Sequence, residues 1–427
     1  MKPIFALVDS NNFFVSCVRV FRPDLEGRPV VALSSNDGCV VARSNEAKAL
    51  GVPMGAPAFK WRQFFKDHSV VQVSGNFELY GDISRRITSI LSTITPHIEL
   101  YSVDESFLDL SELPITDYTA WGQEIRARIL RWTGIPVSIG IAPSKTLAKL
   151  ASDRAKKEPQ LAGVLDLASL STVHRKPYLE RLPIQDVWGV GRRLAPRLRA
   201  EGIANAWQLA STREQLAQAW MGIHGRQMVR ELNGYACLPL MQESKPAKSI
   251  ANTRTFGQDT NQLHVLEAAI ASFAAKTTWR LRSGRQLARH AGLFIATNRH
   301  KPGYRMVSRE IQLPYPSADT GFITAKLVQT LADMFNPACQ YHRAGVWLQD
   351  FVPDSGLQID ILGTIDLASH DTSTNRMRAL DSINHRYGKR SLYYAAEDLG
   401  RGWQPIRQIQ MPRWTTRWDE LPTAKLV

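Results

Sequence analysis

The sequence has few cysteines and no long hydrophobic run. Its cysteines are widely separated and form neither a CxxC pair nor a cluster with histidine; they are Cys17, Cys39, Cys237 and Cys339. This spacing argues against a disulfide framework and against a structural zinc site. No apolar stretch is long enough to cross a bilayer, and the first residues, MKPIFALVDSNN, lack a signal-peptide cleavage pattern. We therefore expect reduced thiols in a cytoplasmic protein that does not act in a membrane.

Acidic residues are also in short supply. There are 39 Asp and Glu residues against 53 Lys and Arg residues, which gives a formal net charge of +14. The basic residues are spread along the whole chain, so we favour a polyanionic partner such as nucleic acid, although an acidic protein or a membrane surface would also suit this charge. At 427 residues, the chain exceeds one ordinary hydrophobic core and should fold as about three domains or more.

Three of these acids interrupt segments with the character of β-strands. Asp9 follows an apolar run in IFALVDSNNFF, and Asp104 and Glu105 lie within IELYSVDESFLDL. Strand interiors disfavour Asp, and neighbouring strands are close enough to bring such groups together. Crowded carboxylates favour a hard cation such as Mg²⁺, and a pair of these ions promotes phosphoryl transfer. The alternative is a hairpin turn at Asp104 and Glu105 and a strand end at Asp9, and spacing alone does not separate these interpretations.

The hydrophobic periodicity predicts an α/β and α+β multidomain protein. In residues 1–165, strand-like runs alternate with helical periodicity, which is typical of a layered α/β domain. Ser144 is a good N-cap for a helix that runs to Lys157. Residues 22–76 are rich in Gly, Pro and short elements and look like an insertion into this domain. Strands are expected at residues 4–8, 29–33, 98–103, 106–110 and 137–142.

The rest of the chain changes character twice. Residues 166–240 have helical periodicity, and polar residues indicate a boundary at 243–248. Residues 250–352 again mix strands with helices. The last 75 or so residues lose regular periodicity, so we expect a tail with local helices. Its tryptophans fit either a partner-binding surface or a small local core; they are Trp403, Trp414 and Trp418.

A turn at Gly189-Val190-Gly191 is the main candidate for DNA binding. Residues 182–198 are predicted to form a helix-hairpin-helix, in which Gly permits the tight turn and N–H groups at the start of the second helix bind a phosphate. An ordinary corner between two helices would also need these glycines. Nearby cations would hold DNA without reading its bases; they are Arg192, Arg193, Arg197 and Arg199.

Basic residues also recur in two other segments. They lie in SKTLAKLASDRAKK, the helix that follows Ser144, and at Arg43 and Lys48 in CVVARSNEAKALGV. A cation can neutralise the charge that develops on a triphosphate, and Lys does so as a point charge. A solvated basic surface explains the same residues, so composition alone does not decide between these interpretations.

Seven ordered segments make the chain recognisable. They are FALVDSNNFFVSC, GRPVVALSSNDGCVVARSNEAKALGVPMG, SGNFELYGDIS, IELYSVDESFLDL, VSIGIAPSKTLAKLASDRAKK, DVWGVGRRL and MPRWTTRWDELP. In this order they resemble the Y-family of translesion DNA polymerases, and within it the UmuC-like group. The resemblance covers nearly the whole chain.

The resemblance implies a right-hand polymerase fold and an activity. The activity is error-prone, template-directed nucleotidyl transfer from a dNTP to a primer 3′-OH, used for lesion bypass in the SOS response to DNA damage. The parts of the fold would be a palm at residues 1–22 and 77–165, fingers at 23–76, a helical thumb with the helix-hairpin-helix at 166–242, a little finger at 249–352 and a UmuC-type tail at 353–427.

Catalytic roles also follow from the resemblance. Asp9, Asp104 and Glu105 would be catalytic and would hold two Mg²⁺ ions, with the main-chain carbonyl of Ser10 as an extra ligand. Phe14 would be the steric gate, an aromatic ring under the sugar that excludes a ribose 2′-OH.

The incoming dNTP would lie against Phe13 and Phe14. Its phosphates would meet cations at Arg43, Lys48 and Lys156. Asn45 is a departure here, because some relatives carry a phosphate-contacting Tyr at that position.

Partners are implied as well. They are primer–template DNA, a processed UmuD-like dimer and a RecA filament, which places the protein at the bacterial nucleoid. The segment Gln358, Ile359, Asp360, Ile361 and Leu362 resembles the peptide that docks bacterial polymerases on the sliding clamp, in which Gln and an aliphatic pair fill an apolar pocket. An amphipathic tail segment is the alternative for these residues.

Two other classes of protein fit part of the sequence. A DNA-binding scaffold without activity would use the helix-hairpin-helix but leave the three acids unexplained. A nucleotide cyclase would use the acids but leave the DNA-binding segments unexplained. Primer extension that is lost in Asp104→Ala would distinguish a polymerase from both.

Overall fold

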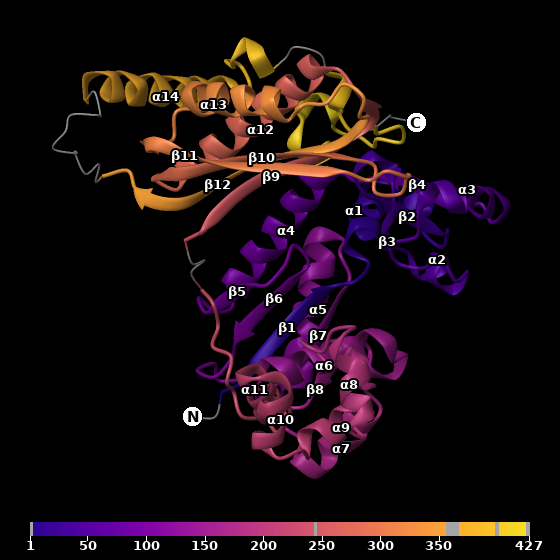
Figure 1. The fold of residues 1–427 in the computed structure, drawn as a ribbon. Coiled ribbons are helices and arrows are strands. Elements are labelled where there is room, and N and C mark those ends of the chain that lie inside the picture. The colour runs from indigo at the N-terminus through magenta and orange to yellow at the C-terminus, as the bar shows by residue number, and fades with distance from the viewer. Residues whose placement is uncertain (1–2, 243–245, 356–366, 398–400, 424–427) are drawn as a thin grey trace. The chain divides into compact units, whose positions relative to one another are not determined.

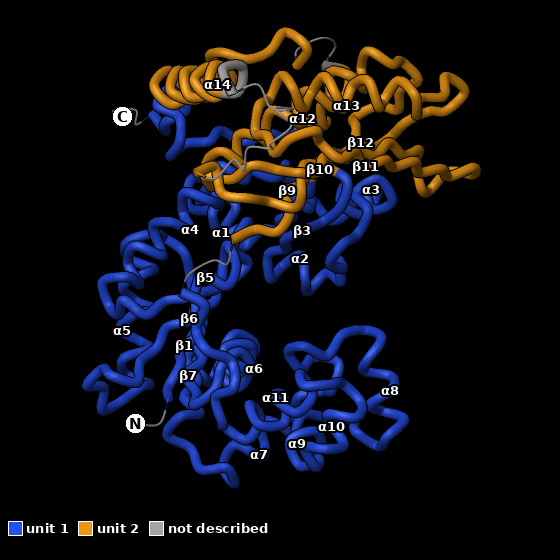
Figure 2. Tube along the Cα trace, turned by 60° about the vertical axis from the view of Figure 1, so that its left-hand side comes forward, with its two compact units in different colours: residues 1–34, 38–244, 409–427 blue, residues 35–37, 245–408 orange. Residues whose placement is uncertain are grey.

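The computed structural model describes residues 3–242, 246–355, 367–397 and 401–423. Figure 1 shows its helices and strands. The chain divides into two compact units, which are coloured separately in Figure 2. Unit 1 comprises residues 1–34, 38–244 and 409–427, and unit 2 comprises residues 35–37 and 245–408. The last segment of the chain therefore belongs to unit 1.

A five-stranded sheet forms the centre of unit 1. Its strand order is β5-β6-β1-β7-β8. β1 is antiparallel to both of its neighbours, β6 and β7, and β1 and β7 are buried nearly throughout, as continuous apolar runs predict. The strands are β1 (Phe5–Ser10), β5 (Ile98–Leu100), β6 (Glu105–Asp109), β7 (Val137–Ala142) and β8 (Val164–Asp166).

The strands predicted from periodicity are largely confirmed in this sheet. Those expected at residues 4–8, 106–110 and 137–142 are present as β1, β6 and β7. The strand expected at 98–103 is shorter, because β5 ends at Leu100 and the chain then turns into β6. Asp104 therefore lies in the turn between two strands, as the alternative interpretation had it, while Glu105 begins a strand.

Helices cover both faces of the five-stranded sheet. Successive side chains of a strand point to opposite faces, so Ala6 and Val8 pack in one core cluster with α1, α4 and α5, and Phe5 and Leu7 pack in another with α6. Asp9 continues the alternation of Phe5 and Leu7, so its side chain lies on the α6 face. These helices are α1 (Phe13–Phe21), α4 (Phe77–Ser92), α5 (Tyr118–Thr133) and α6 (Lys145–Lys157).

Helix α6 approaches the sheet closely. A Cβ atom at Gly140 of β7 would lie 2.1 Å from the backbone nitrogen of Ser152 and 2.2 Å from the carbonyl oxygen of Ala148, so glycine is required there. Ser144 caps the helix by accepting a hydrogen bond from the N–H of Leu147, which confirms the predicted N-cap. The close packing brings side chains of α6 next to the end of β1 that carries Asp9.

Buried charges anchor the N-terminal end of α6. Lys145 pairs with Glu99 at 2.6 Å, and their side chains are 4% and 9% exposed. The buried Glu231 of α11 accepts a hydrogen bond from the N–H of Thr146 at 2.9 Å and another from the N–H of Cys237 at 2.6 Å. A carboxylate beside a helix N-terminus is favoured by the helix dipole, so these contacts fix where α6 begins.

Residues 30–74 form a smaller layer of unit 1. A three-stranded sheet has the order β3-β2-β4, with β2 antiparallel to β3 and parallel to β4. Several of its apolar residues form a separate small core. The elements are β2 (Val30–Leu33), β3 (Val40–Arg43), β4 (Val71–Ser74), α2 (Asn45–Ala49) and α3 (Ala58–Asp67).

The chain after β8 is helical, as its periodicity predicts. Before the Gly189 turn, however, there is a 3₁₀ turn, Ile184–Asp186, where the helix-hairpin-helix prediction expects a helix. Pro183 precedes this turn and lacks the N–H that a helix would use. Gly189 has φ +92°, a conformation that favours glycine. The helices are α7 (Thr172–Glu180), α8 (Leu194–Ala200), α9 (Ala206–Ala210), α10 (Glu214–Met221) and α11 (Ile223–Leu232).

Unit 2 is built on a four-stranded antiparallel sheet. Its strand order is β11-β10-β12-β9, and α12 and α13 share a hydrophobic core with it. The elements are β9 (Ser249–Thr260), β10 (Gln286–Thr297), β11 (Met306–Ser317), β12 (Tyr341–Pro353), α12 (Leu263–Ser283) and α13 (Thr320–Met334).

The tail contains more helix than its sequence suggests. Helix α14 (Leu367–Tyr387) has 21 residues, and ion pairs join it to other elements of unit 2. Arg282 of α12 pairs with Asp381 at 2.7 Å, and Arg376 pairs with Asp319 at 2.6 Å. Because ion pairs hold this helix, it lacks the regular apolar stripe from which helices are predicted.

The tail tryptophans have different environments. Trp403 is buried in the core of unit 2 against Phe273, with ring centroids 5.2 Å apart. Trp414 is buried in the core of unit 1, whereas Trp418 is 91% exposed. Two of the three are therefore core residues. No helix within the described residues is long and apolar enough to cross a membrane.

Candidate active site

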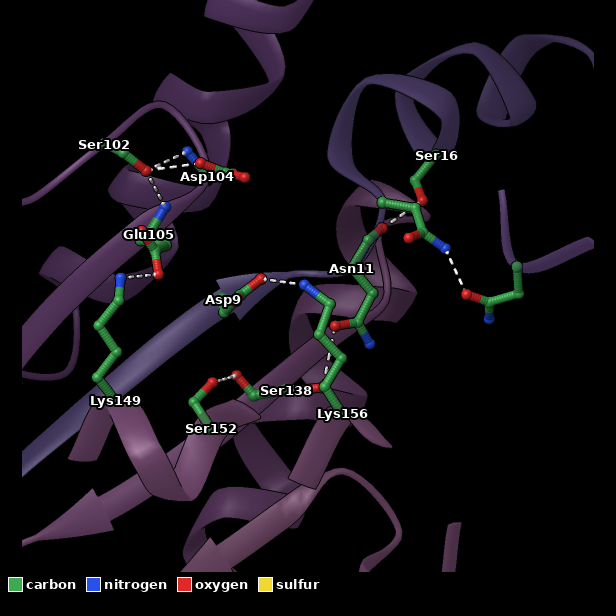
Figure 3. Close-up of polar contacts among 12 residues, drawn as sticks. Asp9, Asn11, Ser16, Ser102, Asp104, Glu105, Ser138, Lys149, Ser152 and Lys156 are labelled. Carbon is green, nitrogen blue, oxygen red and sulfur yellow. Dashed lines mark hydrogen bonds and ion pairs between the residues drawn. The ribbon is translucent and has the colours of Figure 1, made fainter. Parts of the chain in front are cut away.

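Two carboxylates lie on adjacent strands of the sheet, on the face that α6 covers. Asp9 of β1 and Glu105 of β6 are direct cross-strand partners, and such pairs have Cβ atoms about 4.5–5.5 Å apart. Both side chains are 17% exposed. Antiparallel pairing thus brings together two acids that are far apart in the sequence, as predicted (Figure 3).

The third acid is held beside them by the β5–β6 turn. The carbonyl of Asp104 accepts a hydrogen bond from the N–H of Ser10 at 2.9 Å, so the turn is attached to the end of β1. The Asp104 carboxylate accepts a hydrogen bond from the Ser102 hydroxyl at 2.6 Å. That hydroxyl in turn accepts from the N–H of Glu105 at 3.0 Å. Ser102 therefore orders the turn that carries two of the three acids.

Two lysines of α6 neutralise the acids. Lys156 Nζ lies 2.8 Å from an oxygen of Asp9, and Lys149 Nζ lies 2.6 Å from an oxygen of Glu105. Figure 3 shows both side chains reaching from α6 toward the sheet. Residues seven apart share one face of a helix, so one helix supplies a cation for each strand. Lys149 also lies over the ring of Tyr101, 4.6 Å from its centroid.

The electrostatics of Asp9 reflect this crowding. Burial raises the pKa of Asp9 above its ordinary value of 3.8, the charges of Glu105 and Asp104 raise it further, and Lys156 opposes them. A raised pKa means that the ionised carboxylate is disfavoured where it stands. Additional positive charge would relieve this.

The donor set suits a hard divalent cation, although the present side-chain arrangement does not form a closed site. Carboxylate oxygens are the ligands that Mg²⁺ takes, and three of them lie at this edge. Among the described residues, no three His, Cys, Asp or Glu side chains are grouped closely enough to hold an ion. Each of the three carboxylates has a partner within the chain instead. Lys156 pairs with Asp9, Lys149 pairs with Glu105, and Ser102 donates to Asp104.

Phe14 lies in an aromatic cluster near the start of α1. Its ring stacks on Tyr80 of α4 at a centroid distance of 4.3 Å and meets Phe77 edge-on at 5.9 Å. It is only partly buried, so part of the residue remains accessible. Phe13, by contrast, is buried in the core.

The cations predicted at Arg43 and Lys48 belong to one electrostatic group with Lys156. Burial lowers the pKa of Lys48, and the charges of Lys156 and Arg43 lower it further. Lys48 donates to the side chain of Asn12, which donates to Asn45 at 3.0 Å. Asn45 therefore holds Asn12, which faces Lys48. Arg43 donates to the carbonyl of Val52, so its guanidinium is partly committed to the protein.

The glycine turn lies on the surface of unit 1. Gly189, Gly191, Arg192 and Arg193 are all exposed. The adjacent Trp188 donates its indole N–H to the Tyr101 hydroxyl at 3.0 Å. The clamp-like segment of residues 358–362 lies outside the described residues.

Lys149 is the main site residue that the sequence did not single out. It was one of several cations in a basic helix, and no composition argument distinguished it from surface charge. Its seven-residue separation from Lys156 is the signal that could have done so, because it places both cations on the face toward β1 and β6. Ser102 was missed for another reason, since its role depends on the geometry of the turn.

Comparison with solved structures shows which fold this is. A chimera of the Y-family DNA polymerases Dbh and Dpo4 aligns over 82% of this chain and 99% of its own, with a TM-score of 0.65 and 24% identity. DinB from Sulfolobus solfataricus aligns over the same share, with a TM-score of 0.52 and 23% identity. The fold is that of a Y-family DNA polymerase, with palm, fingers, thumb and little finger.

Sequence comparisons specify the family. Residues 8–153 match the impB/mucB/samB family, residues 247–361 match the C-terminal domain of that family, and residues 376–424 match a domain of unknown function. The chain is 39% identical to protein UmuC and 36% identical to protein SamB of Salmonella typhimurium, in each case over 99% of this chain and all of the relative. It is 28% identical to DNA polymerase IV of Moorella thermoacetica over 93% of this chain and 96% of the relative. The chain belongs to the impB/mucB/samB family, as a UmuC-like Y-family DNA polymerase.

Proposed function

We propose that this chain performs error-prone translesion synthesis in the SOS response to DNA damage. It transfers a nucleotide from a dNTP to a primer 3′-OH under the direction of a template. The observation that carries the proposal is the cross-strand pair of Asp9 and Glu105, which faces two lysines of one helix in a chain of this family. A scaffold without activity would not need an acid such as Asp9, whose ionisation is disfavoured by burial.

Asp9, Asp104 and Glu105, with the carbonyl of Ser10, hold two Mg²⁺ ions in this proposal. Ions bound there supply the Lewis acidity that activates the attacking hydroxyl and neutralises the leaving group. The raised pKa of Asp9 supports the assignment, because burial disfavours its ionised carboxylate and a bound cation would favour it. For the three carboxylates to converge, Asp104 leaves Ser102, and Asp9 and Glu105 leave their lysines.

The released lysines then have a second role. Lys156 exchanges the carboxylate of Asp9 for the phosphates of the incoming dNTP, together with Lys48 and Arg43. The lowered pKa of Lys48 supports this, because burial and the like charges of Lys156 and Arg43 disfavour its charged form, which an anionic ligand would favour. Lys156 thereby keeps a negatively charged partner before and after substrate binds.

Phe14 is the steric gate in this proposal. Its ring packs against Tyr80 and Phe77, which hold it in place. A ribose 2′-OH placed against the exposed part of Phe14 would therefore clash with the ring. Phe13 contributes through its main chain at the start of α1. Phe14→Ala should admit ribonucleotides, measured as the ratio of kcat/KM for a dNTP to that for the matching rNTP, and an unchanged ratio would remove the assignment.

DNA and protein partners complete the proposal. Gly189, Gly191, Arg192 and Arg193 contact the phosphates of primer–template DNA, because they are exposed on a turn that favours phosphate binding. A processed UmuD-like dimer, a RecA filament and the sliding clamp are the expected protein partners at the nucleoid in the cytoplasm. The clamp contact is assigned to Gln358, Ile359, Asp360, Ile361 and Leu362.

Primer extension tests the activity directly. The full chain, with Mg²⁺, a processed UmuD-like dimer and a RecA filament, should extend a primer, and Asp104→Asn should abolish extension while DNA binding measured by fluorescence anisotropy persists. Asp24→Asn is the matched control, because Asp24 forms an exposed ion pair with Arg22. Equal extension by the native chain and Asp104→Asn, or none by the native chain, would contradict the proposal.

A further inference from the structure

The C-terminal tail makes a set of contacts in unit 1 that the proposed activity does not use. Residues 409–414, which we call the tail strap, lie against the turn between β4 and α4. The N–H of Ser74 donates to the carbonyl of Ile409 at 3.0 Å, and the Ser74 hydroxyl accepts from the N–H of Ile409 at 3.2 Å. This reciprocal pair fixes the strap to the end of β4.

The next contact is made at the N-cap of α4. The Asn76 side chain caps the helix by accepting from the N–H of Leu79 at 3.3 Å. Its amide group donates to the carbonyl of Pro412 at 2.8 Å. Asn76 therefore uses its acceptor for α4 and its donor for the strap. Arg413 adds an ion pair with Glu78 in the first turn of α4, at 3.5 Å.

The strap also contacts α1. Trp414 is 5% exposed, and its ring stacks on Phe21, the last residue of α1, with centroids 4.8 Å apart and an interplanar angle of 8°. Met411 packs against the same core cluster. A buried aromatic contributes a large apolar area to such a site, so Trp414 is the anchor of the strap.

These contacts join the two helices that carry the gate and its support. Phe14 is in the first turn of α1, and the rings behind it, Tyr80 and Phe77, are in the first turns of α4. The strap holds α1 through Phe21 and holds the start of α4 through Asn76 and Glu78. A shift between the two helices would move the Phe14 ring relative to its support.

We propose that the tail strap is a positioning element for the steric gate, acting on sugar selection through the spacing of α1 and α4. This inference rests on the proposed function, since it takes Phe14 as the gate. The residues that act are Trp414, through Phe21, and Asn76, through Pro412. They touch neither sugar nor phosphate, so they are positioning residues, and their effect passes through Phe14.

The test compares sugar selection in strap variants of the full chain. The measured quantity is the ratio of kcat/KM for a dNTP to that for the matching rNTP, in primer extension with the expected partners. Trp414→Ala should lower this ratio by about tenfold to a hundredfold, as small displacements at a reacting centre do. Trp414→Phe retains an aromatic ring for Phe21 and should restore most of the ratio. Trp418→Ala is the control, because Trp418 is 91% exposed in the same tail and should leave the ratio unchanged.

A second variant avoids dependence on the folding of Trp414→Ala. Asn76→Asp keeps the acceptor that caps α4 but has no amide to donate to Pro412, so it loosens the strap while leaving the helix cap. It should lower the ratio in the same direction as Trp414→Ala, by a smaller factor. An unchanged ratio in Asn76→Asp, together with an unchanged ratio in Trp414→Phe and Trp414→Ala, would overturn the proposal.

A double variant separates positioning from general loss of structure. In the Phe14→Ala background the gate is absent, so Trp414→Ala should change the ratio no further. If Trp414→Ala instead lowers incorporation of both sugars equally in both backgrounds, the strap is structural and the inference is wrong. Failure of the native chain to extend, or extension by Asp104→Asn, would contradict the proposed function rather than the strap.

Discussion

Helix α6 pairs three lysines with three acids of the five-stranded sheet, and the burial of these ion pairs differs between the start of the helix and the rest of it. At its start, Lys145 and Glu99 are 4% and 9% exposed, and the carboxylate also accepts from the N–H of Met241 at 2.8 Å. Farther along, Lys149 and Lys156 are 25% and 27% exposed beside acids that are 17% exposed.

The difference in burial separates a structural pair from exchangeable ones. Breaking a buried pair leaves a charge without water or partner, whereas a partly hydrated lysine can change partners at small cost. The buried end of α6 therefore fixes the helix. In the proposed function, the hydrated part of the helix releases Asp9 and Glu105 to metal ions and turns Lys156 to phosphate.

The largest effect is expected from breaking the buried pair. Lys145→Met should lower the free energy of unfolding by about 3–5 kcal/mol, because Glu99 keeps a buried charge with no cation. Denaturant unfolding of the full chain measures this. Lys157→Met is the control on the same helix, since its pair with Asp153 is exposed and should contribute less than about 1 kcal/mol. Equal losses in the two variants would remove the distinction between the two ends.

The exchangeable pairs should show the opposite pattern. Lys156→Met should lower kcat/KM for dNTP incorporation by about 10²–10³-fold, the range seen when one charge-stabilising group is removed. Its unfolding free energy should change by less than about 1 kcal/mol. Lys149→Met should behave similarly. A large loss of stability without loss of kcat/KM would make these lysines structural instead.

Asp9, the acid of one exchangeable pair, should make the free energy of unfolding depend on pH. The raised pKa of Asp9 means that the folded chain binds this proton more tightly than the unfolded chain does. Stability therefore falls as pH rises from the ordinary pKa of 3.8 through the raised value. Asp9→Asn, which mimics the neutral carboxyl, should become progressively more stable than the native chain across that interval and then keep a constant advantage.

Metal binding should reverse this advantage. Mg²⁺ at about 100 times its dissociation constant stabilises the native chain by about 2.7 kcal/mol, provided that it binds only the folded state. Asp9→Asn should gain less. Unfolding curves with and without Mg²⁺ at neutral pH measure both quantities, and a native chain that is indifferent to Mg²⁺ would contradict the proposed ligands.

The smallest effect is expected on the exposed glycine turn. Arg192→Ala and Arg193→Ala should each reduce the slope of log affinity for duplex DNA against log salt concentration by about 0.9, one phosphate contact each. Their unfolding free energies should be unchanged. Affinity that does not vary with salt would show that the turn is not a phosphate-binding surface.

Local patterns in the sequence predicted much of the fold. The apolar run before Asp9 and the alternation after Glu105 are strands, and Ser144 caps α6, because these features depend on residues near one another in the chain. Local helices were expected in the tail, but the length of α14 was not, because ion pairs such as Arg282 with Asp381 hold a helix that lacks a regular apolar stripe. The first half of the helix-hairpin-helix was also expected as a helix and is a 3₁₀ turn.

By itself, the sequence determined that three acids lie in or beside strand-like segments, that cations recur along α6, and that the ordered motifs belong to one polymerase family. Only the tertiary structure decided which cation meets which acid, that Phe13 is buried while Phe14 is accessible, and that Trp414 packs on Phe21. The physical reason is how far apart in the sequence the residues are that determine each feature. Strand and helix periodicity follow from neighbouring residues, whereas ion pairing, burial and ring stacking depend on segments that only the folded chain brings together.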